Sequence, residues 1–172
     1  MTQLDKSKYG EALKKVIPCR VMTPEDFQFF IGSSELLKYE DGELIVKQGA
    51  VDQSFYAVVA GSVQVMVEET SGKDVYIATI GAGEVFGEAG IFLKVPRTAN
   101  VLSLDDSIIL RITREAVMKF IRQHPVSGNK FLMVIVHSLL KKLKEANQEL
   151  AYERQCDVDQ GDIDSILKDF GV

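Results

Sequence analysis

The sequence is poor in the residues that build metal centres and disulfide scaffolds. Its 172 residues include two cysteines (Cys19 and Cys156), two histidines and no tryptophan. Two cysteines so far apart match neither a disulfide-dense secreted fold nor a CxxC metal knuckle. Because the Cys and His residues are scattered, the sequence also argues against a structural zinc site.

Long hydrophobic runs and an excess of positive charge are missing as well. No apolar run approaches the roughly 18 residues of a membrane span, and the opening MTQLDKSKYG lacks the apolar core of a signal peptide. The net charge of -5, from 20 basic and 25 acidic residues, argues against nonspecific attraction to nucleic acid or anionic lipid. We therefore expect a cytoplasmic protein with no membrane contact and, at 46% apolar residues, an ample buried core.

The first 34 residues have a helical pattern. Residues 4–17 place apolar side chains at loosely helical spacing, and Pro18 discourages continuation. A second helix is predicted from Thr23-Pro24-Glu25-Asp26, which combines a cap residue, a first-turn proline and first-turn acids. It ends at Gly32, so residues 1–34 are expected to form an N-terminal helical segment.

The next segment, residues 35–124, begins with short β-rich runs separated by glycine or aspartate turns. Strands of about five residues with turns at this spacing indicate a compact all-β barrel or sandwich. The strands predicted from these runs are residues 44–46, 54–59, 63–67, 75–80 and 107–112.

Helical patterns return after the strands. A helix is predicted from Thr113 to Arg122, followed after His124-Pro125 by a longer helix over residues 125–154. Its apolar residues step by four and three, the spacing of a heptad seam. They are Leu132, Val136, Leu139, Leu143, Ala146 and Leu150. Either the helix packs on its own barrel, or it associates with a parallel two-fold partner.

The last segment, residues 155–172, is acidic. Ile163, Ile166, Leu167 and Phe170 nevertheless share one helical face, which predicts a short amphipathic helix. A calcium loop starting at Asp157 is excluded, because Gly161 and Lys168 stand where such a loop needs oxygen ligands.

Residues 81–101, GAGEVFGEAGIFLKVPRTANV, carry the candidate site. The glycines let the backbone approach a ligand closely, and amides at the start of a short helix after Gly87 would attract an anion. Arg97 is suited to a phosphate because its planar fork makes two parallel charge-assisted hydrogen bonds. Glu88 is an acceptor for a sugar hydroxyl. From chemistry alone, a structural ion pair between Glu88 and Arg97 is an equal alternative.

The motifs of this segment resemble a known family. Phe86-Gly87-Glu88-Ala89-Gly90, followed by Pro96-Arg97-Thr98-Ala99, resembles the phosphate-binding cassette of cyclic-nucleotide-binding domains. Residues 39–49 and 54–65 look like that family's G-x-x-[IL]-x-x-x-G and YxxxxGxVxV strands. The resemblance covers about residues 20–150. It implies an α+β fold: an antiparallel β-roll, similar to a jelly-roll barrel, flanked by N-terminal helices and a long C-terminal lid or dimerisation helix.

The resemblance also implies roles for individual residues. Arg97 would pair with the phosphate of cAMP or cGMP, Glu88 would accept from the ribose 2′-hydroxyl, and Thr98 would bear on the choice of base. The remaining expected contacts are Val85 and Phe86 beside the ligand and the amides of Gly87, Glu88, Ala89 and Ala99. The expected protein is a sensor without enzyme activity, metal or cofactor.

The output of such a sensor is expected to lie in protein association. Fewer than 25 residues follow Leu150, and this segment is acidic, so we expect no winged helix that reads DNA. The candidates are a homodimer through the helix Leu132–Leu150 and a partner protein docked on residues 159–170, which weakly resemble a docking peptide of flagellar switch proteins. Two alternatives are a β-roll that has lost its ligand and serves structure or dimerisation, and a cupin-like enzyme. The second is disfavoured because His124 and His137 lie in or beside predicted helices rather than on strands.

Overall fold

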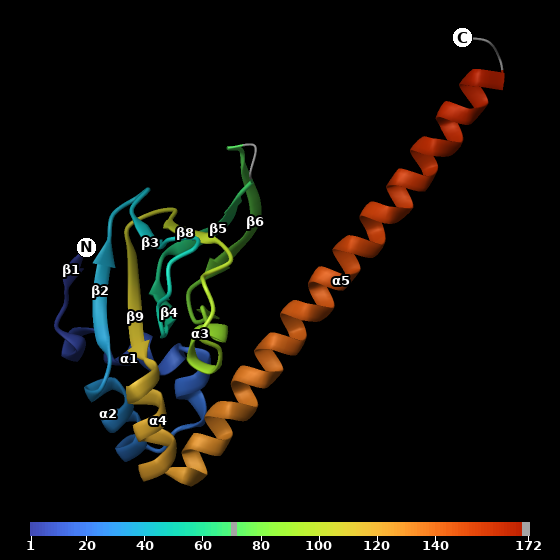
Figure 1. The fold of residues 1–172 in the computed structure, drawn as a ribbon. Coiled ribbons are helices and arrows are strands. Elements are labelled where there is room, and N and C mark those ends of the chain that lie inside the picture. The colour runs from blue at the N-terminus through green and yellow to red at the C-terminus, as the bar shows by residue number, and fades with distance from the viewer. Residues whose placement is uncertain (70–71, 170–172) are drawn as a thin grey trace. The chain divides into compact units, whose positions relative to one another are not determined.

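In the computed structural model of the protein, residues 1–69 and 72–169 are described, with side chains up to Tyr152. The chain divides into two compact units, Met1–Val134 and the remainder from Ile135. The first unit contains every strand and all helices but the continuation of the last one (Figure 1).

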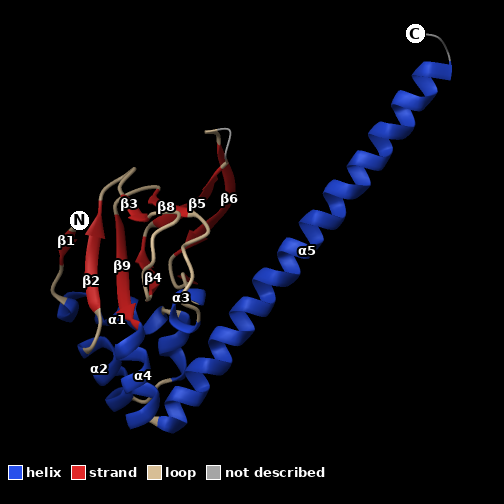
Figure 2. Ribbon diagram, viewed as in Figure 1, coloured by secondary structure: helices blue, strands red, loops and turns tan. Residues whose placement is uncertain are grey.

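Two antiparallel sheets form the β-roll (Figure 2). One has five strands in the order β1-β2-β9-β4-β7, and the other has four in the order β3-β8-β5-β6. The strands are β1 (Thr2–Gln3), β2 (Glu35–Tyr39), β3 (Leu44–Val46), β4 (Ser54–Ala60), β5 (Ser62–Glu68), β6 (Asp74–Gly81), β7 (Val85–Phe86), β8 (Asn100–Ser103) and β9 (Ser107–Thr113). The five predicted strands are confirmed, each within one residue of its predicted ends. The short strands β1, β2, β7 and β8 were not predicted.

Most of the helices are short, and α1, α2 and α4 lie at one end of the roll (Figure 2). They are the 3-10 helices η1 (Lys6–Tyr9) and η2 (Ile17–Val21), and the α-helices α1 (Gly10–Lys15), α2 (Pro24–Gly32), α3 (Ala89–Phe92), α4 (Arg114–Gln123) and α5 (Pro125–Asp169). The predicted start of α2 is confirmed: Thr23 caps it by accepting the amide of Asp26 at 3.2 Å, and Pro24 occupies the first turn.

The helical spacing of residues 4–17 does not produce one continuous helix. The segment is divided between η1 and α1, and Val16 turns to extended backbone with ψ 128°. The amide of Ile17 then donates to the carbonyl of Gly83 at 2.9 Å. Because that amide is used by the roll, the helix ends one turn before Pro18 requires it.

The predicted end of the long helix, near residue 154, is wrong. α5 runs for 45 residues to Asp169 and does not stop near Arg154. The change to acidic composition suggested a boundary, but charged side chains do not end a helix when no proline interrupts it. The amphipathic tail residues named above lie outside the residues whose side chains are described.

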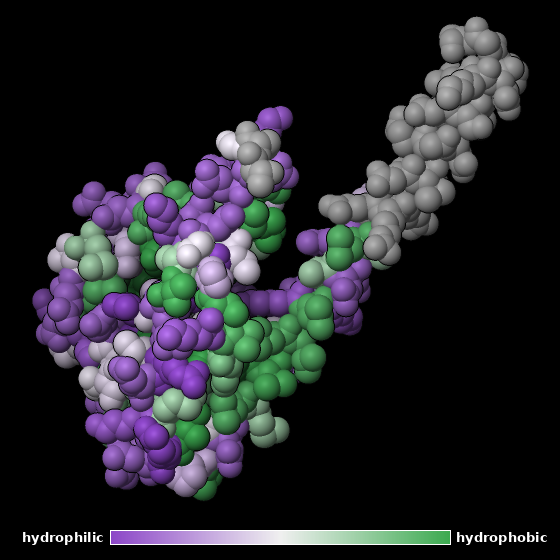
Figure 3. Space-filling view, viewed as in Figure 1, coloured by the Kyte–Doolittle hydropathy of each residue, from purple (hydrophilic) through white to green (hydrophobic). Residues whose placement is uncertain are grey.

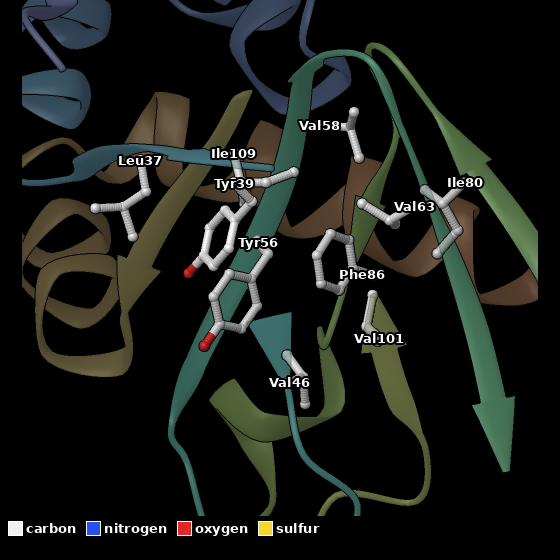
Figure 4. Close-up of a cluster of buried hydrophobic side chains, with 10 residues drawn as sticks. All are labelled: Leu37, Tyr39, Val46, Tyr56, Val58, Val63, Ile80, Phe86, Val101 and Ile109. Carbon is white, nitrogen blue, oxygen red and sulfur yellow. The ribbon is translucent and has the colours of Figure 1, made fainter. Parts of the chain in front are cut away.

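The interior of the roll is an apolar cluster drawn from both sheets (Figure 4). Its buried members are Leu37, Tyr39, Val46, Tyr56, Val58, Val63, Ile80, Phe86, Val101 and Ile109. The rings of Tyr56 on β4 and Phe86 on β7 stack with centroids 5.1 Å apart. This stack fixes β7, the edge strand of the five-stranded sheet, and with it the glycine-rich segment that follows, against β4.

No helix among the described residues combines the length and the apolar character needed to cross a membrane.

Candidate functional site

The glycine-rich turn after β7 passes close to Arg97. β7 places the turn by pairing Phe86 with Tyr56, and Gly87 then adopts φ +73°, a conformation that side chains disfavour. A Cβ on Gly87 would lie 2.9 Å from Nη1 of Arg97, and one on Gly90 would lie 2.6 Å from the same atom. The backbone of both glycines thus approaches the guanidinium of Arg97, and the expected close approach to a ligand stays a prediction.

The guanidinium of Arg97 is buried, with 9% of the residue exposed. Nη1 donates to the carbonyl of Gly87 at 3.0 Å, and Nη2 donates to Oδ2 of Asp52 at 3.0 Å and to the carbonyl of Ser54. The ring of Tyr56 lies 5.8 Å from the guanidinium carbon, within cation–π range. Arg97 is thus held by a carboxylate, two carbonyls and an aromatic ring.

The backbone of Arg97 is fixed by the loop between β3 and β4. The amide of Arg97 donates to the carbonyl of Ala50 at 2.8 Å, and the amide of Gly49 donates to the carbonyl of Arg97 at 2.9 Å. Two reciprocal bonds restrict the φ and ψ angles of this residue, so the direction of its side chain is set before any ligand arrives.

One nitrogen of the guanidinium makes no hydrogen bond in the described structure. Nε of Arg97 is buried and finds no hydrogen-bond acceptor among the residues that the structure describes. A buried donor without an acceptor costs on the order of 1–3 kcal/mol, more when it is charged. An anionic ligand at Nε would remove that cost.

Asp52 is the carboxylate at the centre of this network. Oδ2 accepts from the hydroxyl of Tyr56 at 2.6 Å as well as from Arg97, and Oδ1 lies 3.7 Å from Nη2 of Arg111. Desolvation acts to raise the pKa of Asp52, but hydrogen bonds from Tyr56, Arg97 and Ser54 outweigh it and lower the pKa below its usual value. Burial, followed by the bond to Asp52, raises the pKa of the Tyr56 phenol. The carboxylate is therefore charged and the phenol neutral at neutral pH.

Other predicted site residues surround this centre. Val85, Phe86 and Glu88 are buried, Ala89 and Thr98 are exposed, and Gly87 and Ala99 are half-buried. Glu88 is the first residue before α3, which confirms the short helix expected after Gly87.

The sequence analysis missed Asp52 as the partner of Arg97. The structure pairs Nη2 of Arg97 with Oδ2 of Asp52 at 3.0 Å. Asp52 lies 45 residues before Arg97 and belongs to no motif quoted above; the signal available was its place just before the strand motif that starts at Ser54.

A cavity of about 290 Å³ opens beside the network. Asp52 and Tyr56 line it, whereas none of the sequence-predicted site residues does. Its other lining residues are Met1, Leu37, Tyr39, Ile45, Val46, Lys47, Ala50 and Arg111. In Figure 4 the hydroxyls of Tyr39 and Tyr56 point to the same side, away from Phe86.

A buried guanidinium with one nitrogen free of hydrogen bonds, beside a glycine turn of a β-roll, is an arrangement that suits a small anionic ligand. The family model described as "Cyclic nucleotide-binding domain" matches residues 36–124, and the chain belongs to that family. The family is a regulatory ligand-binding domain, not a catalytic one.

Individual relatives agree with this assignment. The chain is 27% identical over 129 residues to the cyclic AMP receptor protein of Thermus thermophilus, covering 75% of this chain and 58% of that protein. It is 30% identical over 87 residues to a cAMP-dependent protein kinase regulatory subunit of Blastocladiella emersonii, covering 51% of this chain and 22% of that protein. The chain thus spans well under two thirds of these relatives.

Solved structures share the fold. A cyclic nucleotide-binding domain from Methylobacillus flagellatus superposes with a TM-score of 0.77 at 18% identity, over 86% of each chain. The catabolite activator protein of Thermus thermophilus gives a TM-score of 0.65 at 27% identity, over 75% of this chain and 59% of that one. The α+β fold with an antiparallel β-roll, N-terminal helices and a long C-terminal helix is confirmed.

Proposed function

We propose that the protein binds cAMP or cGMP, with the cyclic phosphate at the guanidinium of Arg97. The observation that carries the proposal is the unused Nε donor of a buried arginine. A phosphate oxygen satisfies it, and the negative charge of the phosphate is attracted to the buried guanidinium, which already pairs with Asp52. Similarity to a cyclic AMP receptor protein and to a cAMP-dependent protein kinase regulatory subunit supports this choice of ligand.

The rest of the ligand contacts follow the family resemblance. Glu88 accepts from the ribose 2′-hydroxyl, the amides of Gly87, Ala89 and Ala99 face the phosphate and ribose, and Val85 and Phe86 border the sugar. Support comes from the position of the turn: the pairing of Phe86 with Tyr56 places it beside the guanidinium.

Calorimetric titration tests the proposal. Titrations with cAMP, cGMP and linear 5′-AMP are compared, because the linear nucleotide has the same base and sugar but a doubly charged, uncyclised phosphate. We expect saturable heat with at least one cyclic nucleotide and much weaker binding of 5′-AMP. If neither cyclic nucleotide gives heat, the proposal fails and the alternative of a structural or dimerisation module stands.

Thr98 bears on the choice between the two nucleotides. Its side chain is exposed next to the buried Arg97, where a hydroxyl can donate to or accept from a base. Replacing it by alanine should weaken cGMP more than cAMP, by roughly three- to tenfold for one neutral hydrogen bond. Equal effects on both nucleotides would leave Thr98 without a role in selection.

We infer that α5 carries the signal, by a ligand-driven rearrangement and by association with a second copy of the chain. Its heptad positions Val136, Leu139, Leu143 and Leu150 are 37–57% exposed, and Figure 3 shows hydrophobic residues gathered over the first part of this helix. Exposed apolar residues at heptad spacing favour pairing with another helix.

Sedimentation measurements, with and without nucleotide, test the dimer. We expect a species of twice 19.1 kDa for the parent and a monomer for Leu143→Glu, with Lys144→Glu as the matched control off the seam. A parent that sediments only as a monomer at all concentrations contradicts the dimer. Docking of a partner protein on residues 159–170 stays a prediction, since those side chains lie outside the described part of the structure.

A further inference from the structure

The corner between α4 and α5 is unusually short. His124 is the C-cap of α4 and Pro125 is the first residue of α5, so one residue joins the two helices. The amide of His124 donates to the carbonyl of Phe120 at 2.8 Å, and the amide of Gly128 donates to the carbonyl of His124 at 2.7 Å. A Cβ on Gly128 would lie 2.8 Å from Cα of Ile121, so the two helices are in backbone contact at the corner.

One carboxylate, that of Asp26 in the first turn of α2, ties this corner to the N-terminal helices. Oδ1 lies 2.5 Å from Nδ1 of His124, and Oδ2 accepts from the hydroxyl of Ser127 and, at 2.7 Å, from that of Thr23. Ser127 lies in the first turn of α5 and is buried, at 3% exposed. A single side chain therefore joins the start of α2, the end of α4 and the start of α5.

The ring of His124 also packs in an aromatic cluster. The His124 ring lies 4.6 Å from that of Phe29 and 5.5 Å from that of Phe120, between centroids. Phe120 in turn contacts Phe131 of α5 at 6.3 Å, and Phe131 contacts Phe55 of β4 at 5.9 Å. These ring contacts continue from α2 to the roll. Ring packing tolerates small shifts, whereas hydrogen bonds require a defined geometry, so the bonds to Asp26 fix the orientation of the corner.

Hydrogen bonds of this kind are strong but few. Charge-assisted bonds are about twice as strong as neutral ones, and those from Ser127 and Thr23 also lower the pKa of the Asp26 carboxyl. Two of the three side-chain donors, His124 and Ser127, belong to the α4–α5 corner, so losing this carboxylate removes both ties at once.

We propose that Asp26 is a positioning residue that latches the first turn of α5 to α2, through His124 and Ser127, and so sets how freely the lid helix departs from the roll. The role of α5 as a lid rests on the proposed function, whereas the latch itself does not require a nucleotide. Residues Pro125–Val134 belong to the same compact unit as Asp26, which is why the latch acts at the base of the helix.

Hydrogen exchange without nucleotide tests the latch. Asp26→Asn keeps the size of the side chain and removes its charge, and Ser127→Ala removes one donor. Asp106→Asn is the matched control, because Asp106 is an exposed aspartate that forms an ion pair with Lys38. Relative to the parent, amides of residues 128–134 should exchange about tenfold faster in Ser127→Ala and ten- to a hundredfold faster in Asp26→Asn. Amides of the β4–β9 ladder serve as the internal reference and should change less than threefold.

Two results would overturn the latch. If the amides of residues 128–134 exchange at the same rate in Ser127→Ala as in the parent, the proposed latch is refuted, even if Asp26→Asn fails to fold. Equal acceleration of the β4–β9 ladder shows that Asp26 only stabilises the unit as a whole. A second measurement with saturating cAMP or cGMP separates this inference from the proposed function: a parent that binds no nucleotide refutes the function, while the nucleotide-free exchange still decides the latch.

Discussion

Replacing Arg97 by glutamine should abolish most of the nucleotide affinity. Glutamine removes the positive charge and the planar fork of the guanidinium. Its neutral Nε2 can donate only an uncharged bond from the place of Nε, the guanidinium nitrogen that makes no hydrogen bond in the described structure. One charge-assisted bond contributes about 1.5–3 kcal/mol, so the dissociation constant should rise roughly ten- to a hundredfold. Calorimetry measures this change, with Arg122→Gln, an exposed residue on α4, as the matched control.

The same substitution also disturbs the fold, and the structure shows how to separate the two effects. Without Arg97, Asp52 keeps its bond from Tyr56 and its contact with Arg111 but loses its nearest charged donor. Because the carboxyl side chain is 28% exposed, we expect a loss of about 1–3 kcal/mol in the free energy of unfolding. Adding Asp52→Asn removes the carboxylate that was left without its arginine and should restore most of that stability.

The double variant Arg97→Gln/Asp52→Asn therefore decides the argument. It should fold nearly as stably as the parent, by denaturant unfolding, and still bind nucleotide weakly. If it binds as tightly as the parent, Arg97 acts only by neutralising Asp52 and the assignment of the phosphate to its guanidinium is refuted.

Three further predictions follow from the same contacts. Gly90→Ala places a methyl group 2.6 Å from Nη1 of Arg97, so calorimetry should show at least tenfold weaker nucleotide binding. An unchanged dissociation constant would mean that the guanidinium can shift freely. The folded-state pKa values of Asp52 and Asp26 are lowered, so their contributions to stability are present above about pH 4 and are lost as the pH falls below it. In Asp52→Asn, the free energy of unfolding should therefore depend less on pH in the acid range, as followed by circular dichroism. An unaltered acid profile would contradict the lowered pKa. Phe120→Ala empties the fully buried centre of the aromatic cluster and should cost about 3–5 kcal/mol in thermal or denaturant unfolding; a loss below about 1 kcal/mol would mean that the cluster collapses around the gap.

Local patterns were sufficient for the regular strands and for the helix starts. The runs at residues 54–59 and 63–67 alternate with glycine turns, and both are strands. Thr23 and Thr113 each precede a helix and each accept an amide three residues on. These signals are local, because a cap or a turn needs only the residues next to it.

The short elements could not be predicted in the same way. β7 has two residues and exists because Val85 and Phe86 pair with β4. α1 ends at Lys15 because the amide of Ile17 donates to the carbonyl of Gly83. In both cases the partner lies far away in the chain, so no periodicity within the segment reports it.

The sequence by itself predicted the candidate site residues, a glycine turn with Glu88 and Arg97 in one segment, because their types and spacing are properties of the chain. Only the tertiary structure decided which groups hold the guanidinium. Asp52, Ser54 and Gly87 meet Arg97 through the packing of β4 against β7, and that packing leaves Nε as the donor without an acceptor. The direction of a buried side chain and the donor it keeps open depend on contacts between distant segments, which the sequence does not encode as a local pattern.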